Sequence, residues 1–239
     1  MGVMKNPPLK TFRLDFQYEK PNPLTMDGLT EISQALSQFF PTAPGISLME
    51  YPSSSIKLPL NIGPFVFKTS DKRNQVQLFS NGLIFLFTSY DNWQPTRDII
   101  VKTLRSCCEI LKIQRIFGFR MEYVDEFIFP REGFKLSKFF NLEPNIPSSF
   151  SLDYTDFHLG IKLQTTEYTR LILRLRGIQP SRDDIFQFLL ESLYIDLPEF
   201  ENCEEETLNK RLGSAHASLI DNFKKCLNTD FYKTLEGGG

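Results

Sequence analysis

The chain has 239 residues, of which 41% are hydrophobic and 23% charged, and its formal net charge at pH 7 is −2. This composition excludes a largely disordered chain, and charges of both signs along its length argue against a polybasic coat for nucleic acid or membrane lipid. No apolar run reaches the length of a membrane-spanning helix, so a cytoplasmic protein without a membrane partner is expected.

The N-terminal region predicts one strand followed by one helix. Apolar and polar residues alternate over Phe12–Tyr18, which is the period of a strand with one buried face. Thr25 is a suitable N-cap, and apolar residues recur at helical spacing over Leu29–Phe40. The segment Ile46–Phe67 predicts one or two short strands joined by loops.

A hairpin follows, and it is the clearest local prediction. The apolar runs Gln75–Ser80 and Leu83–Ser89 flank Asn81-Gly82, a pair that suits the two positive-φ positions of a type I′ turn. Trp93-Gln94-Pro95-Thr96 is then typical of a helix start, and the spacing of the apolar residues predicts a helix through Lys112.

The next predicted strand covers Ile116–Val124. Alternation places Phe117 and Phe119 on one face of this strand and Arg120 on the other. The proline-containing segment Pro130–Ser149 is interpreted as a connection with one helical turn. This connection puts the boundary between two halves of the chain near residue 145.

The C-terminal part predicts a second hairpin with helices after it. Its strands are Phe157–Gln164 and Tyr168–Arg176, and leucines alternate with arginines along the second one. The S-x-x-D sequence Ser181–Asp184 predicts the start of a short helix that runs through Leu193. Acidic residues followed by apolar residues at spacings of three and four predict a long last helix over Leu208–Leu227.

These elements predict an α+β protein of two similar halves, each an antiparallel hairpin or sheet packed by amphipathic helices. The predicted halves are residues 1–145 and 146–235, and residues 236–239 are expected to be a linker or a frayed tail. The chain has 23 phenylalanines and one tryptophan, so a phenylalanine-filled core is expected.

The cysteines and histidines limit the metal and redox chemistry that the sequence predicts. They are Cys107, Cys108, Cys203, Cys226, His158 and His216. No C-x-x-C pair occurs, so reduced thiols in a reducing compartment are expected, with Cys107 and Cys108 packed in the core. The spacing gives no reason to expect a zinc site. No metal and no cofactor are therefore predicted.

A basic strand is the first candidate site. Arg170, Arg174 and Arg176 are expected to share an exposed strand face, with Lys162 contributed by the partner strand. Such a face can receive phosphates. Pairing with acidic residues across the sheet is the favoured interpretation, and the aromatic residues of a base-stacking platform do not interleave with these arginines.

The second candidate site consists of Arg120, Glu122, Asp125 and His216. The first three residues lie at the end of a strand, where an acid pair can act on a substrate. A histidine among apolar residues of a helix more often holds one hydrogen bond beside the core than acts as a base. No Walker, G-x-G-x-x-G, H-E-x-x-H or G-x-S-x-G motif occurs, so no catalytic residue is assigned.

Three segments carry a resemblance to a known family. They are Phe85–Trp93 with the helix after it, Phe117–Phe127, and Ala215-His216 with Phe223 seven residues on. The chain resembles an uncharacterised, sporadically distributed bacterial protein family of about this length with no assigned activity. The resemblance implies a compact protein of two α+β halves and an accessory role beside a larger effector of a defence-type system, and it transfers no site residue.

The sequence leaves three functions open. The first and favoured one is a non-enzymatic interaction module, with a homodimer as one arrangement, that binds a protein partner through a sheet edge or a phenylalanine-rich surface. The second is a nucleic-acid or ribonucleoprotein (CRISPR-type) accessory that binds through the basic strand. The third is an enzyme of unknown class, which requires Glu122, Asp125 and His216 to meet in a deep pocket.

Overall fold

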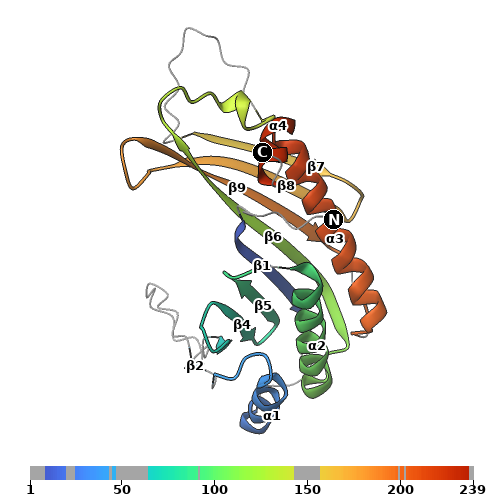
Figure 1. Cartoon of the computed structure of the whole chain (residues 1–239). Helices are drawn as coiled ribbons and strands as arrows, with labels where there is room; N and C mark the ends of the chain where they lie inside the picture. Colours follow the sequence, from blue (N-terminus) through green and yellow to red (C-terminus); the bar gives the residue numbers. More distant parts are fainter. Residues whose placement is uncertain are drawn as a thin grey trace, which may run out of the picture. The chain divides into compact units, whose positions relative to one another are not determined.

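A computed structural model describes residues 9–19, 25–42, 45–46, 64–90, 92–142, 157–198, 200–201 and 203–236. Helices and strands occur together along the chain, which is therefore an α+β protein (Figure 1). The chain divides into two compact units. Unit 1 comprises Met1–Phe12, Arg120–Asp196 and Leu212–Gly239, and unit 2 comprises Arg13–Phe119 and Leu197–Arg211.

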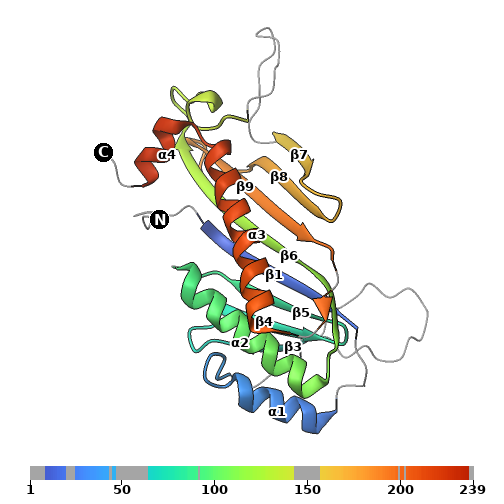
Figure 2. The ribbon, with the colours of Figure 1, turned by 90° about the vertical axis from the view of Figure 1, so that its right-hand side faces the viewer.

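Unit 2 is an antiparallel set of strands with two helices. Its elements are the larger part of β1 (Leu9–Tyr18), α1 (Met26–Leu36), β2 (Gly45–Ile46), β3 (Phe65–Lys68), β4 (Asn74–Phe79), β5 (Gly82–Phe87), α2 (Trp93–Leu111) and β10 (Phe200–Glu201). The strand order is β2-β3-β4-β5-β1. Helix α2 lies on one face of these strands, and α1 packs beside it (Figure 2).

A side chain caps the start of each helix in unit 2, and the sequence predicts the cap at Thr25. The Thr25 side chain accepts a hydrogen bond from the Gly28 N–H at 3.1 Å, and Asn92 accepts one from the Gln94 N–H at the same distance. These side chains satisfy N–H groups that have no partner inside the helix. Lys112 caps the C-terminus of α2: its φ of 56° is left-handed, and its N–H donates to the Cys108 carbonyl.

The first hairpin is confirmed, but its turn lies one residue earlier than predicted. Phe79 pairs with Gly82, so the loop residues are Ser80 and Asn81, and neither Asn81 nor Gly82 has a positive φ. Gly82 is needed for a different reason: a Cβ added there would lie 2.9 Å from the Phe16 carbonyl oxygen of β1. Asn81-Gly82 therefore does not form a type I′ turn, and the glycine is required because β5 lies close to β1 at this position.

Unit 1 is a second antiparallel set of strands, with helices on one face. Its elements are most of β6 (Arg115–Pro130), the 3-10 turn η1 (Leu136–Lys138), β7 (His158–Gln164), β8 (Thr169–Ile178), β9 (Ile185–Asp196), the C-terminal part of α3 (Glu205–Cys226) and α4 (Thr229–Leu235). The strand order is β6-β9-β8-β7. Helices α3 and α4 lie on the same face of β6 (Figure 2), and the prediction did not include α4.

Strand β9 replaces the short helix that the sequence predicts after Ser181–Asp184. Its residues pair with β8 in antiparallel register from Gln187 to Asp196. Phe188, Leu190 and Ser192 are buried at a spacing of two, which is the period of a strand. Leucines on the opposite face of β9 are half-buried as well. Because apolar residues occur on both faces, their spacing in the sequence resembles that of a helix.

Strand β6 departs from the predicted alternation at Gly118. This glycine has a φ of 134°, a conformation that favours glycine over other residues. Phe117 is 39% exposed whereas Phe119 is 3% exposed, so the two phenylalanines do not share a face as predicted. The extra residue shifts the alternation by one, as a β-bulge does.

The predicted phenylalanine core is confirmed in unit 1. Neighbouring rings contact one another along β6, η1, β9, α3 and α4; they are Phe127, Phe129, Phe134, Phe139, Phe140, Phe186, Phe188, Phe223 and Phe231. The division of the chain near residue 145 stays a prediction, and Gly237–Gly239 lie outside the described residues. Among the described helices, none combines the length and the apolar character needed to cross a membrane.

Two glycine-to-alanine substitutions should shift stability in opposite directions. Gly82→Ala should destabilise the protein by about 1–3 kcal/mol, because the new methyl group meets the backbone of β1. Gly213→Ala in α3 should stabilise it by about 0.5–1 kcal/mol, since its Cβ meets no atom within 4 Å. Urea denaturation of both variants measures the difference, and equal midpoints would contradict the close approach at Gly82.

Candidate functional site: an open basic sheet face in unit 1

The four basic residues of the first candidate site share one face of unit 1. Arg170, Arg174 and Arg176 lie on β8, where they pair with Gln164, Gly160 and His158 of β7, and Lys162 lies on the same face of β7. Residues that pair directly across strands point to the same side of a sheet. We call this side of β7, β8 and β9 the basic face. The buried leucines of β8 point to the other side, where α3 and α4 lie.

One acidic residue partly neutralises the basic face. Glu191 of β9 pairs with Arg174 in register, and both Arg174 and Arg176 form ion pairs with its carboxylate. The favoured interpretation, cross-strand charge pairing, is therefore confirmed for these two arginines. Lys162 and Arg170 form no ion pair with any described residue. On β7, β8 and β9, four basic side chains against one acidic side chain leave this face positive, and Glu126 of the neighbouring β6 is paired with Lys10.

The outer edge of β7 exposes backbone groups. The Gly177 N–H donates to the Phe157 carbonyl at 2.8 Å, and the Thr165 N–H donates to the Thr169 carbonyl at 3.1 Å. In an antiparallel pair, bonded and non-bonded residues alternate, so the odd-numbered residues of β7 bond to β8. The N–H and C=O groups of the even-numbered residues point away from β8; these residues are His158, Gly160, Lys162 and Gln164. Within the described part of the chain, no strand pairs with this edge.

The second candidate set is separated by the structure. Asp125 is 5% exposed and lies on the buried face of β6, whereas Glu122 lies on the opposite face and Arg120 is exposed. Residues at odd and even positions of a strand point to opposite sides. Glu122 and Asp125 therefore do not share a site, and the converging pocket that an enzyme built on both residues requires does not form between them.

His216 has the structural role that the sequence favours. Its Nδ1 atom lies 2.7 Å from the Tyr123 hydroxyl oxygen, and the two rings meet edge to face. Burial lowers the pKa of His216 to about 4, so the imidazole is neutral at pH 7. A neutral ring with its proton on Nε2 accepts the hydrogen bond from the tyrosine. The pair fastens α3 to β6 inside unit 1.

A buried carboxyl and a buried thiol lie close together in unit 1. Burial raises the pKa of Asp125 to about 8, so its carboxyl is mostly protonated at pH 7. Burial and the nearby Asp125 charge raise the pKa of Cys226 to about 12. A protonated thiol is a poor nucleophile, so this pair does not provide a reactive thiolate at neutral pH. The sequence did not signal the pair, since the two residues lie on separate elements.

In unit 2 the structure corrects the expectation of four reduced thiols. Cys108 of α2 forms a disulfide with Cys203, across a sequence separation of 95 residues, and Cys107 and Cys226 are free and buried. A pocket of about 440 Å³ lies over the disulfide, and its other lining residues are Arg105, Glu109, Lys112, Ile113, Gln114 and Glu204. No spacing motif marks such a distant pair, so the sequence could not predict it.

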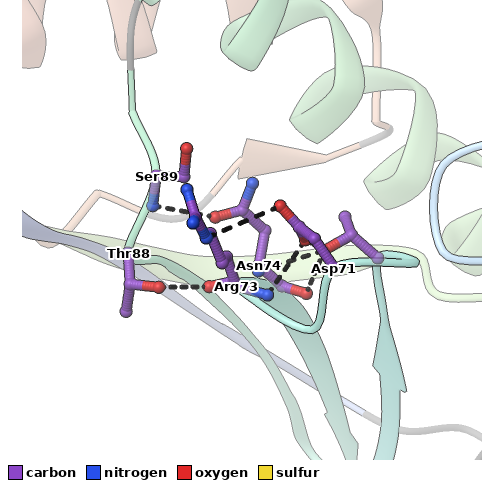
Figure 3. Close-up of polar contacts among 6 residues, drawn as sticks. Asp71, Arg73, Asn74, Thr88 and Ser89 are labelled. Carbon is purple, nitrogen blue, oxygen red and sulfur yellow. Dashed lines mark hydrogen bonds and ion pairs between the residues drawn. The ribbon is translucent and has the colours of Figure 1, made fainter.

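A polar cluster at the β3–β4 turn of unit 2 is satisfied by its own members (Figure 3). The Arg73 N–H donates to the Asp71 carboxylate, the Thr88 hydroxyl donates to the Arg73 carbonyl, and the Ser89 N–H donates to the Asn74 side chain. The hydrogen bond from the Thr69 hydroxyl, with that from Arg73, lowers the pKa of Asp71. These contacts fix a turn, and no described group of His, Cys, Asp or Glu side chains is close enough to hold a metal ion.

Stability should fall with rising pH because of Asp125. Its pKa is about 8 in the folded protein and about 3.9 in an unfolded chain, so the folded state binds the additional proton between these values. Below pH 4 the stabilisation is complete, and it is lost as pH rises through 8. His216 acts in the opposite sense below pH 6.5, which makes pH 6.5–8 the window for measurement.

Urea denaturation across that window tests the carboxyl. Wild-type stability should fall by up to about 1.4 kcal/mol per pH unit, and Asp125→Asn should remove this slope. The exposed Asp183→Asn is the matched control and should keep the wild-type slope. Equal slopes in wild type and Asp125→Asn would show that Asp125 is ionised in the folded protein.

Thiol counting tests the disulfide and the predicted compartment. Denatured, unreduced protein should bind two alkylating groups, at Cys107 and Cys226, and reduced protein four. Reduction should lower stability by about 2–4 kcal/mol and have no effect on a Cys108→Ser/Cys203→Ser variant. The same count on protein trapped in its host tests the cytoplasmic location, because a reducing compartment leaves all four thiols free.

Three surface features of the described residues are candidates for function: the basic face, the β7 edge and the pocket over the Cys108–Cys203 disulfide. The resemblance to a sporadically distributed bacterial family stays a prediction. No protein-family model and no curated protein matches the chain.

Proposed function

We propose that this chain is a non-enzymatic interaction module that binds a protein partner by strand addition at β7. The proposal rests on the row of backbone N–H and C=O groups that point away from β8, at His158, Gly160, Lys162 and Gln164. Unpaired N–H and C=O groups on a regular strand edge are a template for another strand, and β-augmentation is an established mode of peptide recognition.

Apolar side chains near the edge support this proposal. Leu163 of β7 is 42% exposed, and Tyr168, in the loop just before β8, is 52% exposed. An added strand would cover Leu163 and remove apolar surface from water. The phenylalanine-rich surface that the sequence offers as an alternative is less suited, because rings such as Phe127, Phe140 and Phe188 are buried against one another.

The placement of the titratable residues supports a non-enzymatic role. Glu122 and Asp125 lie on opposite faces of β6, and the imidazole of His216 is engaged by Tyr123. The thiol of Cys226 is buried and protonated at neutral pH. These groups stabilise unit 1 and do not form an acid–base or nucleophilic set with one another.

The positive charge of the basic face favours one alternative function. A nucleic-acid or ribonucleoprotein accessory would place phosphates on Arg170, Arg174 and Lys162, with affinity that falls steeply as salt rises. Arg174 is 43% exposed and shares Glu191 with Arg176, so part of this charge is already neutralised. Phosphate binding to side chains does not use the backbone of β7, and this difference separates the two functions experimentally.

Four further proposals concern the role of the chain, its location, its internal similarity and its oligomeric state. We propose that the chain assists a larger defence-type effector and works in the cytoplasm. The β3-β4-β5 and β7-β8-β9 triplets are both antiparallel; α2 follows the first directly, and α3 follows the second after the two-residue strand β10, which supports two similar halves. A homodimer is the remaining proposal, and sedimentation of the purified chain tests it.

A proline at Gly160 should abolish strand addition without unfolding unit 1. The Gly160 N–H points away from β8, so proline removes a donor that only a partner strand uses, and there is room for a Cβ because the nearest atom lies 3.9 Å away. Tagged wild type, Gly160→Pro and the control Gly160→Ala are purified from the host, and their bound proteins are quantified by mass spectrometry.

The expected result is one stoichiometric protein that wild type and Gly160→Ala retain and Gly160→Pro loses by at least tenfold. Thermal unfolding must show that all three variants fold alike. A partner that all three retain equally would reject the β7 edge. Nuclease-sensitive material that remains on Gly160→Pro and leaves at high salt would favour the nucleic-acid function instead.

A further inference from the structure

We infer that the segment bound at the β7 edge is an acidic–apolar strand, with acidic residues opposite Gly160 and Lys162 and an apolar residue between them. The inference rests on the proposed strand addition and specifies the chemistry of the partner. It follows from the two faces of β7, from the unpaired charge of Lys162 and from the lack of a side chain at Gly160, the cross-strand partner of Arg174.

The alternation of β7 assigns a different chemistry to each face of an added strand. Residues opposite Gly160 and Lys162 must point to the basic face, because directly opposed side chains lie on one side of a sheet. The residue between them lies on the other face, beside Ile161 and Leu163. Leu163 is 42% exposed, so an apolar neighbour there would bury it.

Lys162 selects an acidic residue at the position opposite to it. Its side chain is exposed and forms no ion pair with the described residues. Side chains directly opposite across antiparallel strands have Cβ atoms about 4.5–5.5 Å apart, close enough for a glutamate or aspartate to reach the ammonium group. A lysine or arginine at the same position would repel it.

Gly160 opens a path to Arg174 for a second acidic residue. Arg174 is the direct partner of Gly160 on β8, and the glycine places no side chain between Arg174 and an added strand. The Arg174 guanidinium lies 3.6 Å from Glu191, beyond hydrogen-bond distance, whereas Arg176 donates a hydrogen bond to the same carboxylate. Arg174 therefore retains donors that an incoming carboxylate can accept.

Charge complementarity favours this occupant over a second copy of the chain. Pairing of β7 with another β7 would bring two basic faces edge to edge, each with its own Lys162 and arginines. A neutral strand would leave the positive charge of the face unpaired. An acidic strand compensates it, and the lysine at the centre of the edge then discriminates against basic and self-pairing strands.

A pair of synthetic peptides tests the inference. The probe is fluorescein-labelled Thr-Val-Glu-Val-Glu-Val-Thr, and the matched control carries Lys in place of both Glu. Fluorescence anisotropy on the full chain should show at least tenfold tighter binding of the Glu peptide. Lys162→Glu should reverse this preference, Arg174→Gln should reduce it, and Lys135→Glu, remote from the β7 edge in sequence, should leave it unchanged.

The outcomes distinguish failure of the inference alone from failure of the proposed function. Equal binding of both peptides, lost in Gly160→Pro, would overturn the acidic partner and leave strand addition standing. Absence of peptide binding would overturn the inference, and host partner capture by Gly160→Pro would then decide the function by itself. Displacement of the Glu peptide by a single-stranded oligonucleotide that Gly160→Pro still binds would overturn both. If Gly160→Pro fails to fold, the reversal in Lys162→Glu carries the test.

Discussion

The two-residue period of a strand is the constraint on which the chemistry of unit 1 depends. Along β6 it sends Tyr123 and Asp125 toward α3 and sends Glu122 and Glu126 to the other side. Glu126 accordingly finds partners on the open side, in Lys10 and Gln187. Strand β6 thus places the buried polar residues Tyr123 and Asp125 against the helices and a row of charged residues on the opposite face. Because the two sets lie on opposite faces, they cannot form a single site.

The same period makes β7–β9 a two-faced sheet. The leucines of β8 fill one side, and its arginines occupy the other side with Glu191. Covering this face with a helix or another sheet would remove those charges from water, which is unfavourable unless each charge is paired. The face therefore suits water or a partner that brings acidic groups, and the exposed backbone of β7 gives such a partner its register.

Local signals were predicted from the sequence, and contacts between distant residues were not. The cap at Thr25 and the alternation of the arginines around Arg174 depend only on neighbouring residues, and both were predicted correctly. Gly82 was assigned to a turn because its real partner, the Phe16 carbonyl, lies on another strand. Strand β9 was mistaken for a helix because neither of its faces is polar throughout.

The candidate site shows the same limit. The basic residues were identified, but Glu191, the shared partner of Arg174 and Arg176, lies on the segment that the sequence assigned to a helix, so the degree of neutralisation was not predictable. His216 was expected to hold one hydrogen bond, and only folding reveals Tyr123, which lies 93 residues away, as the partner. The unpaired backbone groups on the edge of β7 can be identified only from the register of β7 with β8.

The Cys108–Cys203 disulfide has a topological consequence. The segment Arg120–Asp196 of unit 1 is an insertion between the two segments of unit 2, and both cysteines belong to unit 2, on either side of that insertion. The covalent bond therefore closes a ring that contains the whole inserted segment. A protease that cuts the backbone once anywhere inside this ring produces two fragments that remain joined, and the nicked molecule keeps its full mass until a reductant opens the ring.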